Sequence, residues 1–118
     1  MIHLSQSRSS IIFEREGDAL SILYWGKKIG GATAKFDEAF NAALTRATAH
    51  GGLDNAVGNL VLREHARGWI GHPALRGHRG GVSVSNAFVI KNLSQKDQTL
   101  NVEFLTSLLV LKFLWLTP

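Results

Sequence analysis

The amino-acid sequence predicts a mainly β protein: an antiparallel β-sandwich with one short helix near residues 36–49. Two observations lead to this fold class. Short runs along the chain alternate apolar and polar side chains with a period of two, as strands with one buried face do. Polar and glycine-containing turns separate these runs, which favours antiparallel neighbours. We count about five or six strands, few for a closed sandwich, which leaves open both a complete and an incomplete domain.

The first quarter of the chain predicts a β-meander. Residues 1–6 and 9–15 are expected to form two short strands, and residues 20–28 (LSILYWGKK) form a third. The turn before the third strand is EGDA, in which Gly17 tolerates a positive φ. One face of the third strand is expected to carry these side chains: Leu20, Ile22 and Tyr24.

The expected helix lies in the middle of the chain. In FDEAFNAALTRATAHGG, Phe36, Phe40 and Leu44 fall at helical spacing, and alanine is abundant. Asp37 suits the N-cap, and the two glycines that follow the segment end the helix.

A second β group is expected near the C-terminus. Residues 82–90 (VSVSNAFVI) and 99–105 (TLNVEFL) both alternate, with the polar segment 91–98 (KNLSQKDQ) as the turn between them. The apolar end of the chain after Thr106 has two interpretations of equal weight: a buried core element, or a chain end that departs from its ancestral sequence. A helix lying on a membrane is disfavoured, because its polar face would need several basic residues and this segment has one lysine. It is shorter than the roughly 20 residues of a membrane-spanning helix, so we expect no span.

Residues 62–81 (LREHARGWIGHPALRGHRGG) are the most polar and glycine-rich stretch of the chain. Five glycines and Pro73 exclude a long helix there, so an ordered loop is expected, with a short extended piece around Ala74 and Leu75. Its histidines lie six or seven residues apart, and no carboxylate cluster joins them, so no metal site is predicted. Its arginines could contact phosphates, but Glu64 interrupts them and no nucleic-acid-binding motif surrounds them.

Composition narrows the function classes further. The length of 118 residues and a hydrophobic content of 45% suit one globular domain. A net charge of +4, spread along the chain, does not require a nucleic-acid partner. The absence of cysteine excludes disulfides and zinc–thiolate sites, and the N-terminus does not resemble a secretory signal, so we expect a cytoplasmic protein. No cofactor motif and no convincing pair of carboxylates stands out, so no catalytic residue is assigned.

Four segments, taken in order, resemble the glycoside hydrolase family 36 alpha-galactosidases: YWGK, FDEAF, the loop at residues 62–81, and SNAFVIKNL. The resemblance extends from about residue 1 to about residue 105 and implies the N-terminal region of such an enzyme. In that family a β-supersandwich packs against a (β/α)8 barrel, which carries both catalytic aspartates. The family hydrolyses terminal α-galactosides with retention of configuration and often forms tetramers.

The resemblance leads to a specific set of expectations. Residues 1–118 would be a partial N-terminal β-sandwich domain without the catalytic barrel, inactive alone and without metal or cofactor. Its partners would be the barrel, an α-galactoside bound by the full enzyme and further copies of that enzyme, with no nucleic acid or membrane. The family aspartate that matches Asp37 contacts sugar, and Trp69 offers an apolar face to a sugar ring. Asp37 has an equally strong interpretation as the helix cap, and Trp69 stands where many members carry an aspartate.

One alternative from another class stays open. The chain would then be a stand-alone carbohydrate- or protein-binding β module, with Trp69 as its platform and no catalytic partner.

Overall fold

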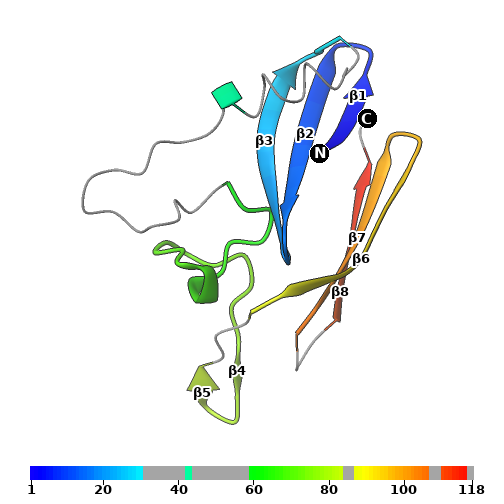
Figure 1. The fold of residues 1–118 in the computed structure, drawn as a ribbon. Helices are drawn as coiled ribbons and strands as arrows, with labels where there is room; N and C mark the ends of the chain where they lie inside the picture. Colours follow the sequence, from blue (N-terminus) through cyan, green and yellow to red (C-terminus); the bar gives the residue numbers. More distant parts are fainter. Residues whose placement is uncertain (31–41, 44–58, 84–86, 107–109, 117–118) are drawn as a thin grey trace.

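A computed structural model describes residues 1–30, 42–43, 59–83, 87–106 and 110–116. Regular structure in this part of the chain is almost entirely β, which confirms the predicted fold class (Figure 1). The strands are β1 (Ile2–Gln6), β2 (Ser9–Glu16), β3 (Ala19–Lys27), β4 (His78–Arg79), β5 (Val82–Ser83), β6 (Val89–Lys96), β7 (Thr99–Leu105) and β8 (Val110–Leu116). A 3-10 turn, η1, spans His65–Arg67. Of the helix expected near residues 36–49, only Ala42 and Ala43 are described; both are helical, and the rest lies outside the described residues.

The N-terminal strands form the expected meander, an antiparallel sheet in the order β1-β2-β3. The turn between β2 and β3 contains Gly17 at a φ of 58°, a conformation in which a side chain would be strained. A bulge interrupts the β2–β3 ladder: Ile12 is opposite Tyr24, whereas Phe13 is opposite Ile22. Leu23 is therefore the extra residue, and Tyr24 lies on the other face from Ile22. The prediction that Ile22 and Tyr24 share one face was wrong, because a bulge shifts the period-two alternation by one residue.

The second sheet has the order β6-β7-β8, and all its pairs are antiparallel. The polar segment 91–98, expected as a turn, is mostly strand: β6 continues to Lys96, and only Asp97 and Gln98 make the turn. Asp97 has a φ of 53°, a conformation that aspartate tolerates better than most residues. β6 looks polar because most of its side chains are exposed, while Ile90 is buried.

The apolar C-terminal segment is also a strand. β8 pairs with β7 from Leu105 opposite Val110 to Thr99 opposite Leu116, so Val110–Leu116 is a strand and not a helix. Among the described residues, no helix has the length and apolarity required to cross a bilayer.

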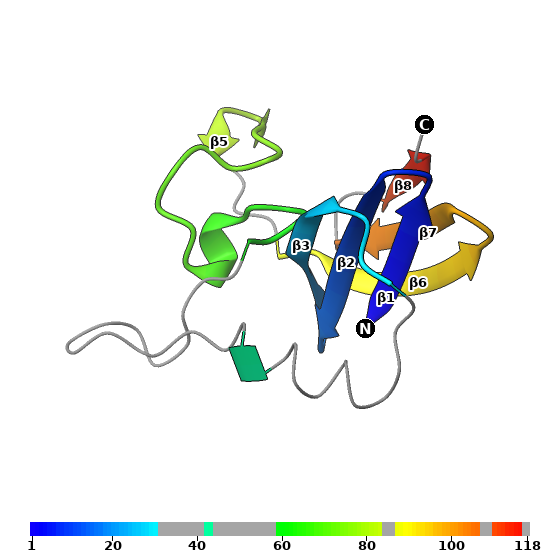
Figure 2. The same cartoon turned by 90° about the horizontal axis from the view of Figure 1, so that it is seen from above.

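Figures 1 and 2 show the two three-stranded sheets lying opposite each other, and both contribute to one hydrophobic core. The buried cluster consists of Leu4, Ile11, Phe13, Leu20, Leu62, Phe88, Ile90, Leu100, Val102 and Phe104. Three phenylalanines, each at most 2% exposed, are its largest members: Phe13 from the first sheet, Phe104 from the second, and Phe88 from the segment that enters the second. The sheets therefore pack face to face as layers of a small sandwich.

Polar contacts join the sheets where β1 meets the β6–β7 hairpin. The main-chain N–H of Ser5 donates to Gln98 Oε1 over 2.9 Å, and Gln95 Nε2 donates to the carbonyl of His3 over 3.3 Å. We call these two contacts the glutamine bridge. Each side-chain amide bonds the edge of β1 in the way that the peptide group of a neighbouring strand would.

Candidate binding loop

The loop at residues 62–81 starts from the free edge of β3. The N–H of Ile22 donates to the carbonyl of Asn59, and the N–H of Val61 donates to the carbonyl of Leu20, each over 2.8 Å. Leu60 and Leu62 are buried beside them. The first residues of the loop are thus hydrogen-bonded to the sheet, which fixes the direction in which the rest of the loop leaves it.

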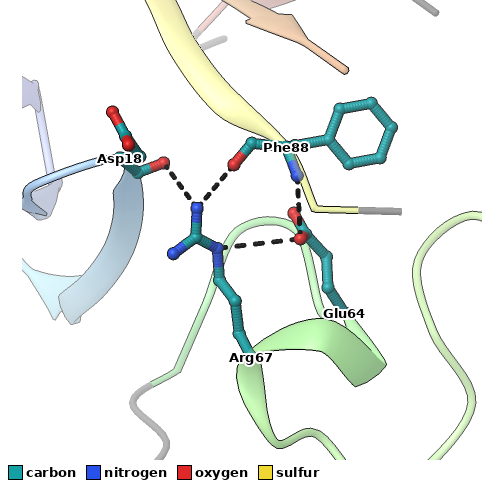
Figure 3. A network of polar contacts seen from close by, with 4 residues as sticks. All are labelled: Asp18, Glu64, Arg67 and Phe88. Carbon is teal, nitrogen blue, oxygen red and sulfur yellow. Dashed lines mark hydrogen bonds and ion pairs between the residues drawn. The ribbon is translucent and has the colours of Figure 1, made fainter. Parts of the chain in front are cut away.

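Glu64 and Arg67 then attach the loop to the start of β6 (Figure 3). The Glu64 carboxylate accepts the N–H of Phe88 over 3.0 Å, and Arg67 donates to the carbonyl of the same residue. Arg67 Nε lies 3.6 Å from Glu64 Oε2, and Arg67 Nη2 donates to the carbonyl of Asp18 over 3.4 Å. We call this network the Glu64–Arg67 clamp. It links three segments: the loop, the β2–β3 turn and the entry to the second sheet.

Burial governs the charge of Glu64. The residue is only 5% exposed, and loss of hydration raises the pKa of its carboxyl above the ordinary value. The N–H of Phe88 and the nearby charge of Arg67 oppose that rise, because both stabilise the ionised form. Glu64 is also the only acidic residue in the sequence from 62 to 81, so the exposed face of the loop carries no carboxylate.

Trp69 is half-buried and held on several sides. The Arg63 guanidinium lies over its ring, 4.8 Å from the centroid, in a cation–π arrangement. Its Nε1–H donates to the carbonyl of His72 over 3.0 Å. The ring also lies against Gly71, where an added Cβ would come within 2.9 Å of the indole nitrogen. Glycine is therefore required at residue 71 for this close approach.

His65 supports the loop from within. Its Nε2 lies 2.9 Å from the carbonyl of Gly71, so this nitrogen carries the proton and donates. Gly68, at a φ of 83°, ends η1 and reverses the chain before Trp69. In the part of the chain that the structure describes, no three histidine or acidic side chains are placed to hold a metal ion.

The outer face of the loop combines apolar and basic side chains. Ile70 is 98% exposed, and Leu75 is also exposed. Arg63, His72 and Arg76 are exposed on the same loop. An apolar residue of this size left almost fully in water, among cations, is suited to contact with another surface.

The two sequence-predicted site residues have different outcomes. Trp69 is in an ordered loop, where Arg63 occupies a position over its ring. Asp37 lies outside the described residues. The extended piece expected around Ala74 and Leu75 was wrong: both residues are in a bend, and the short strand of this loop, β4, begins at His78.

Sequence reasoning missed the roles of Glu64 and Arg67. It treated the glutamate as an interruption of a basic run and the arginine as a phosphate contact. Their spacing of three residues, which places an acid and a base side by side in a helical turn, was the available signal.

Comparison with known proteins gives one relative. The chain is 31% identical over 99 residues to an alpha-galactosidase of Escherichia coli, a match that covers 84% of this chain and 13% of that protein. No known family profile matches the chain. No solved structure matches it either. Over most of its length, this chain is therefore similar to a small part of an alpha-galactosidase.

Proposed function

We propose that the chain is a non-catalytic β-sandwich domain from the N-terminal region of a family 36 alpha-galactosidase. The observation that carries this proposal is the 31% identity to the Escherichia coli enzyme across most of the chain. Because the match involves only 13% of that enzyme, catalysis is assigned to a barrel that residues 1–118 do not include. The full enzyme would hydrolyse terminal α-galactosides in the cytoplasm, as an assembly of several copies.

The fold supports this assignment. The two three-stranded antiparallel sheets share a core, as expected of part of a sandwich. The loop at residues 62–81 leaves this sandwich with an apolar and basic outer face, which suits contact with a catalytic domain or with a sugar.

Trp69 is the residue that we assign to sugar contact in this loop. An indole ring packs well against the apolar face of a pyranose, and Arg63 and Gly71 hold this ring in place. Asp37 is assigned a second contact on the strength of the family resemblance, since a carboxylate accepts strong hydrogen bonds from sugar hydroxyls.

A chimeric enzyme tests the proposal. The stretch of the Escherichia coli alpha-galactosidase that aligns with this chain is replaced by the corresponding residues of this chain, and hydrolysis of p-nitrophenyl α-galactoside is measured. We expect the chimera to hydrolyse the substrate and the 118-residue chain alone to show no turnover. A folded chimera without activity, or turnover by the isolated chain, contradicts the proposal.

Variants of the chimera test the sugar contacts. Trp69→Ala is expected to raise KM about tenfold, since stacking contributes roughly 1–2 kcal/mol, whereas Trp69→Phe retains most of the aromatic face. Asp37→Ala is expected to weaken sugar binding as well. If Trp69→Phe is as impaired as Trp69→Ala, the role of the ring is to support the loop through the bond to His72.

The alternative of a stand-alone binding module is tested on the same protein. Galactose or melibiose is titrated into the isolated chain while tryptophan fluorescence is recorded, with Trp69→Phe as the control. Saturable binding by the isolated chain, lost in the variant, would favour the module over the enzyme domain.

A further inference from the structure

We propose that Glu64 and Arg67 are positioning residues: their hydrogen bonds to the main chain of Phe88 determine where Trp69 and Ile70 lie relative to the two sheets. This inference concerns the position of the loop and is measured in the 118-residue chain. Only the use of that position for sugar contact rests on the proposed function.

The first argument is that the loop is bonded to the main chain of a core residue, Phe88. Phe88 precedes β6, and both polar groups of its main chain bond to side chains of the loop, Glu64 and Arg67. Together these side chains take the place of a neighbouring strand. The Phe88 ring is 1% exposed within the core, so its main chain is a rigid point shared with the second sheet.

The second argument is that Glu64 contacts Phe88 through its side chain and Trp69 through its main chain. Its side chain binds Phe88, while its main-chain carbonyl accepts the N–H of Arg67 over 3.1 Å and the N–H of Trp69 over 3.2 Å. The left-handed Gly68 reverses the chain between these donors. A displacement of Glu64 therefore displaces Trp69 with it.

The third argument is the exposure of the outer end of the loop. Ile70 is 98% exposed, so packing against the core does not hold it. Its position depends on the loop residues on either side of it, and the clamp is where this loop bonds to the main chain at the start of the second sheet. The contact of Arg67 with the Asp18 carbonyl fixes the same point against the first sheet.

The experiment follows the indole N–H of Trp69 by NMR, assigned through its loss in Trp69→Phe. Arg67→Gln and Glu64→Ala are expected to shift this signal and to speed its exchange with solvent about tenfold, which corresponds to the loss of roughly one hydrogen bond. Each variant keeps the main-chain carbonyl of Glu64, so a change at Trp69 reports altered position rather than a deleted contact.

Three controls make the result specific. Glu64→Gln keeps an oxygen that accepts the N–H of Phe88 and should leave the Trp69 signal close to that of the native chain. Arg63→Gln removes the cation on the ring, so it should change the Trp69 signal while the Phe88 amide stays protected. The indole N–H of Trp25, whose side chain is 74% exposed on β3, should not change in any variant.

The contrary outcomes are equally definite. The proposal is overturned if the Trp69 signal is unchanged in both Arg67→Gln and Glu64→Ala. It is also overturned if both variants unfold the sheets, because the network would then be required for the fold itself rather than for the position of the loop.

Discussion

The two polar links between the sheets differ in chemistry. The glutamine bridge joins neutral amides to the edge of β1, in contacts exposed to solvent. The Glu64–Arg67 clamp joins a buried carboxylate and a partly exposed guanidinium to the main chain of a core residue. Exposed amides exchange their partners for water at little cost, whereas a buried charge has no such replacement. The clamp is therefore expected to contribute more to stability than the glutamine bridge, and it lies beside the candidate binding loop.

The largest effect is expected from Arg67→Ala. This change leaves the buried carboxylate of Glu64 without its cation, and it removes the donor to the carbonyls of Phe88 and Asp18. We expect the free energy of unfolding at neutral pH to fall by about 2–3 kcal/mol, measured by urea denaturation. Glu64→Gln is the matched control and should cost less. A smaller loss in Arg67→Ala than in Glu64→Gln would show that the cation is dispensable.

Acidification is expected to reveal the cost of the buried charge. Burial raises the pKa of Glu64 in the folded chain above its ordinary value of 4.5, so the folded chain binds this proton more tightly than the unfolded chain does. Above the raised pKa, the buried charge of Glu64 makes its full unfavourable contribution to the stability of the folded chain. This contribution is relieved as pH falls from there towards 4.5.

The measurement for this prediction is the difference in unfolding free energy between the native chain and Glu64→Gln across that interval. The difference should shift in favour of the native chain as the pH falls. A shift in the opposite direction would mean that Arg67 and the N–H of Phe88 outweigh burial. The glutamine bridge has no titrating group among its bonded atoms, so Gln98→Ala should follow the native pH profile.

Breaking the glutamine bridge should have a smaller effect. Gln95→Ala or Gln98→Ala is each expected to cost about 0.5–1 kcal/mol, because each removes a solvent-exposed hydrogen bond to the edge of β1. The amide of Ser5 should exchange faster with solvent in Gln98→Ala, as followed by hydrogen exchange, and less so in Gln95→Ala. A loss as large as that of Arg67→Ala would remove the contrast between the two links.

The smallest effect is expected from Arg63→Gln. The Arg63 cation over the Trp69 ring contributes about 0.5–1 kcal/mol, as expected for an exposed pair, and much of that acts within the loop. Thermal unfolding of the whole chain should therefore change by only a degree or two, while the fluorescence of Trp69 changes clearly. A substantial drop in the melting temperature would show that the outer end of the loop also supports the core.

The sequence pattern predicted the strands wherever one face is buried and the other is not. β1, β2 and β7 follow alternating or compact apolar runs, so local patterning was sufficient for them. The strand expected at residues 82–90 coincides with β6 only at Val89 and Ile90, because the polar side chains of residues 91–96 favour a turn. Exposed strand residues are polar for the same reason that turn residues are. The secondary structure of β8 was not predicted, because a continuous apolar run lacks the periodicity that distinguishes a strand from a helix.

The candidate site was only partly predictable. The glycine-rich composition of residues 62–81 indicated an ordered loop, and Trp69 was identified as its principal aromatic residue. The partner of Glu64 was not predictable, because Phe88 lies 24 residues further along the chain. Phe88 also bonds through its main-chain N–H, which nearly every residue type has, so its identity does not indicate the contact.

The sequence by itself determined that this protein is a β-sheet protein with turns at defined positions, because alternation and turn chemistry act between near neighbours in the chain. Only the tertiary structure decided that Ile22 and Tyr24 lie on opposite faces and that the apolar tail is a strand beside β7. It alone decided that Glu64 and Arg67 bind Phe88. These outcomes depend on which distant segments meet in the core, where burial and main-chain hydrogen bonds outweigh the preferences of single residues.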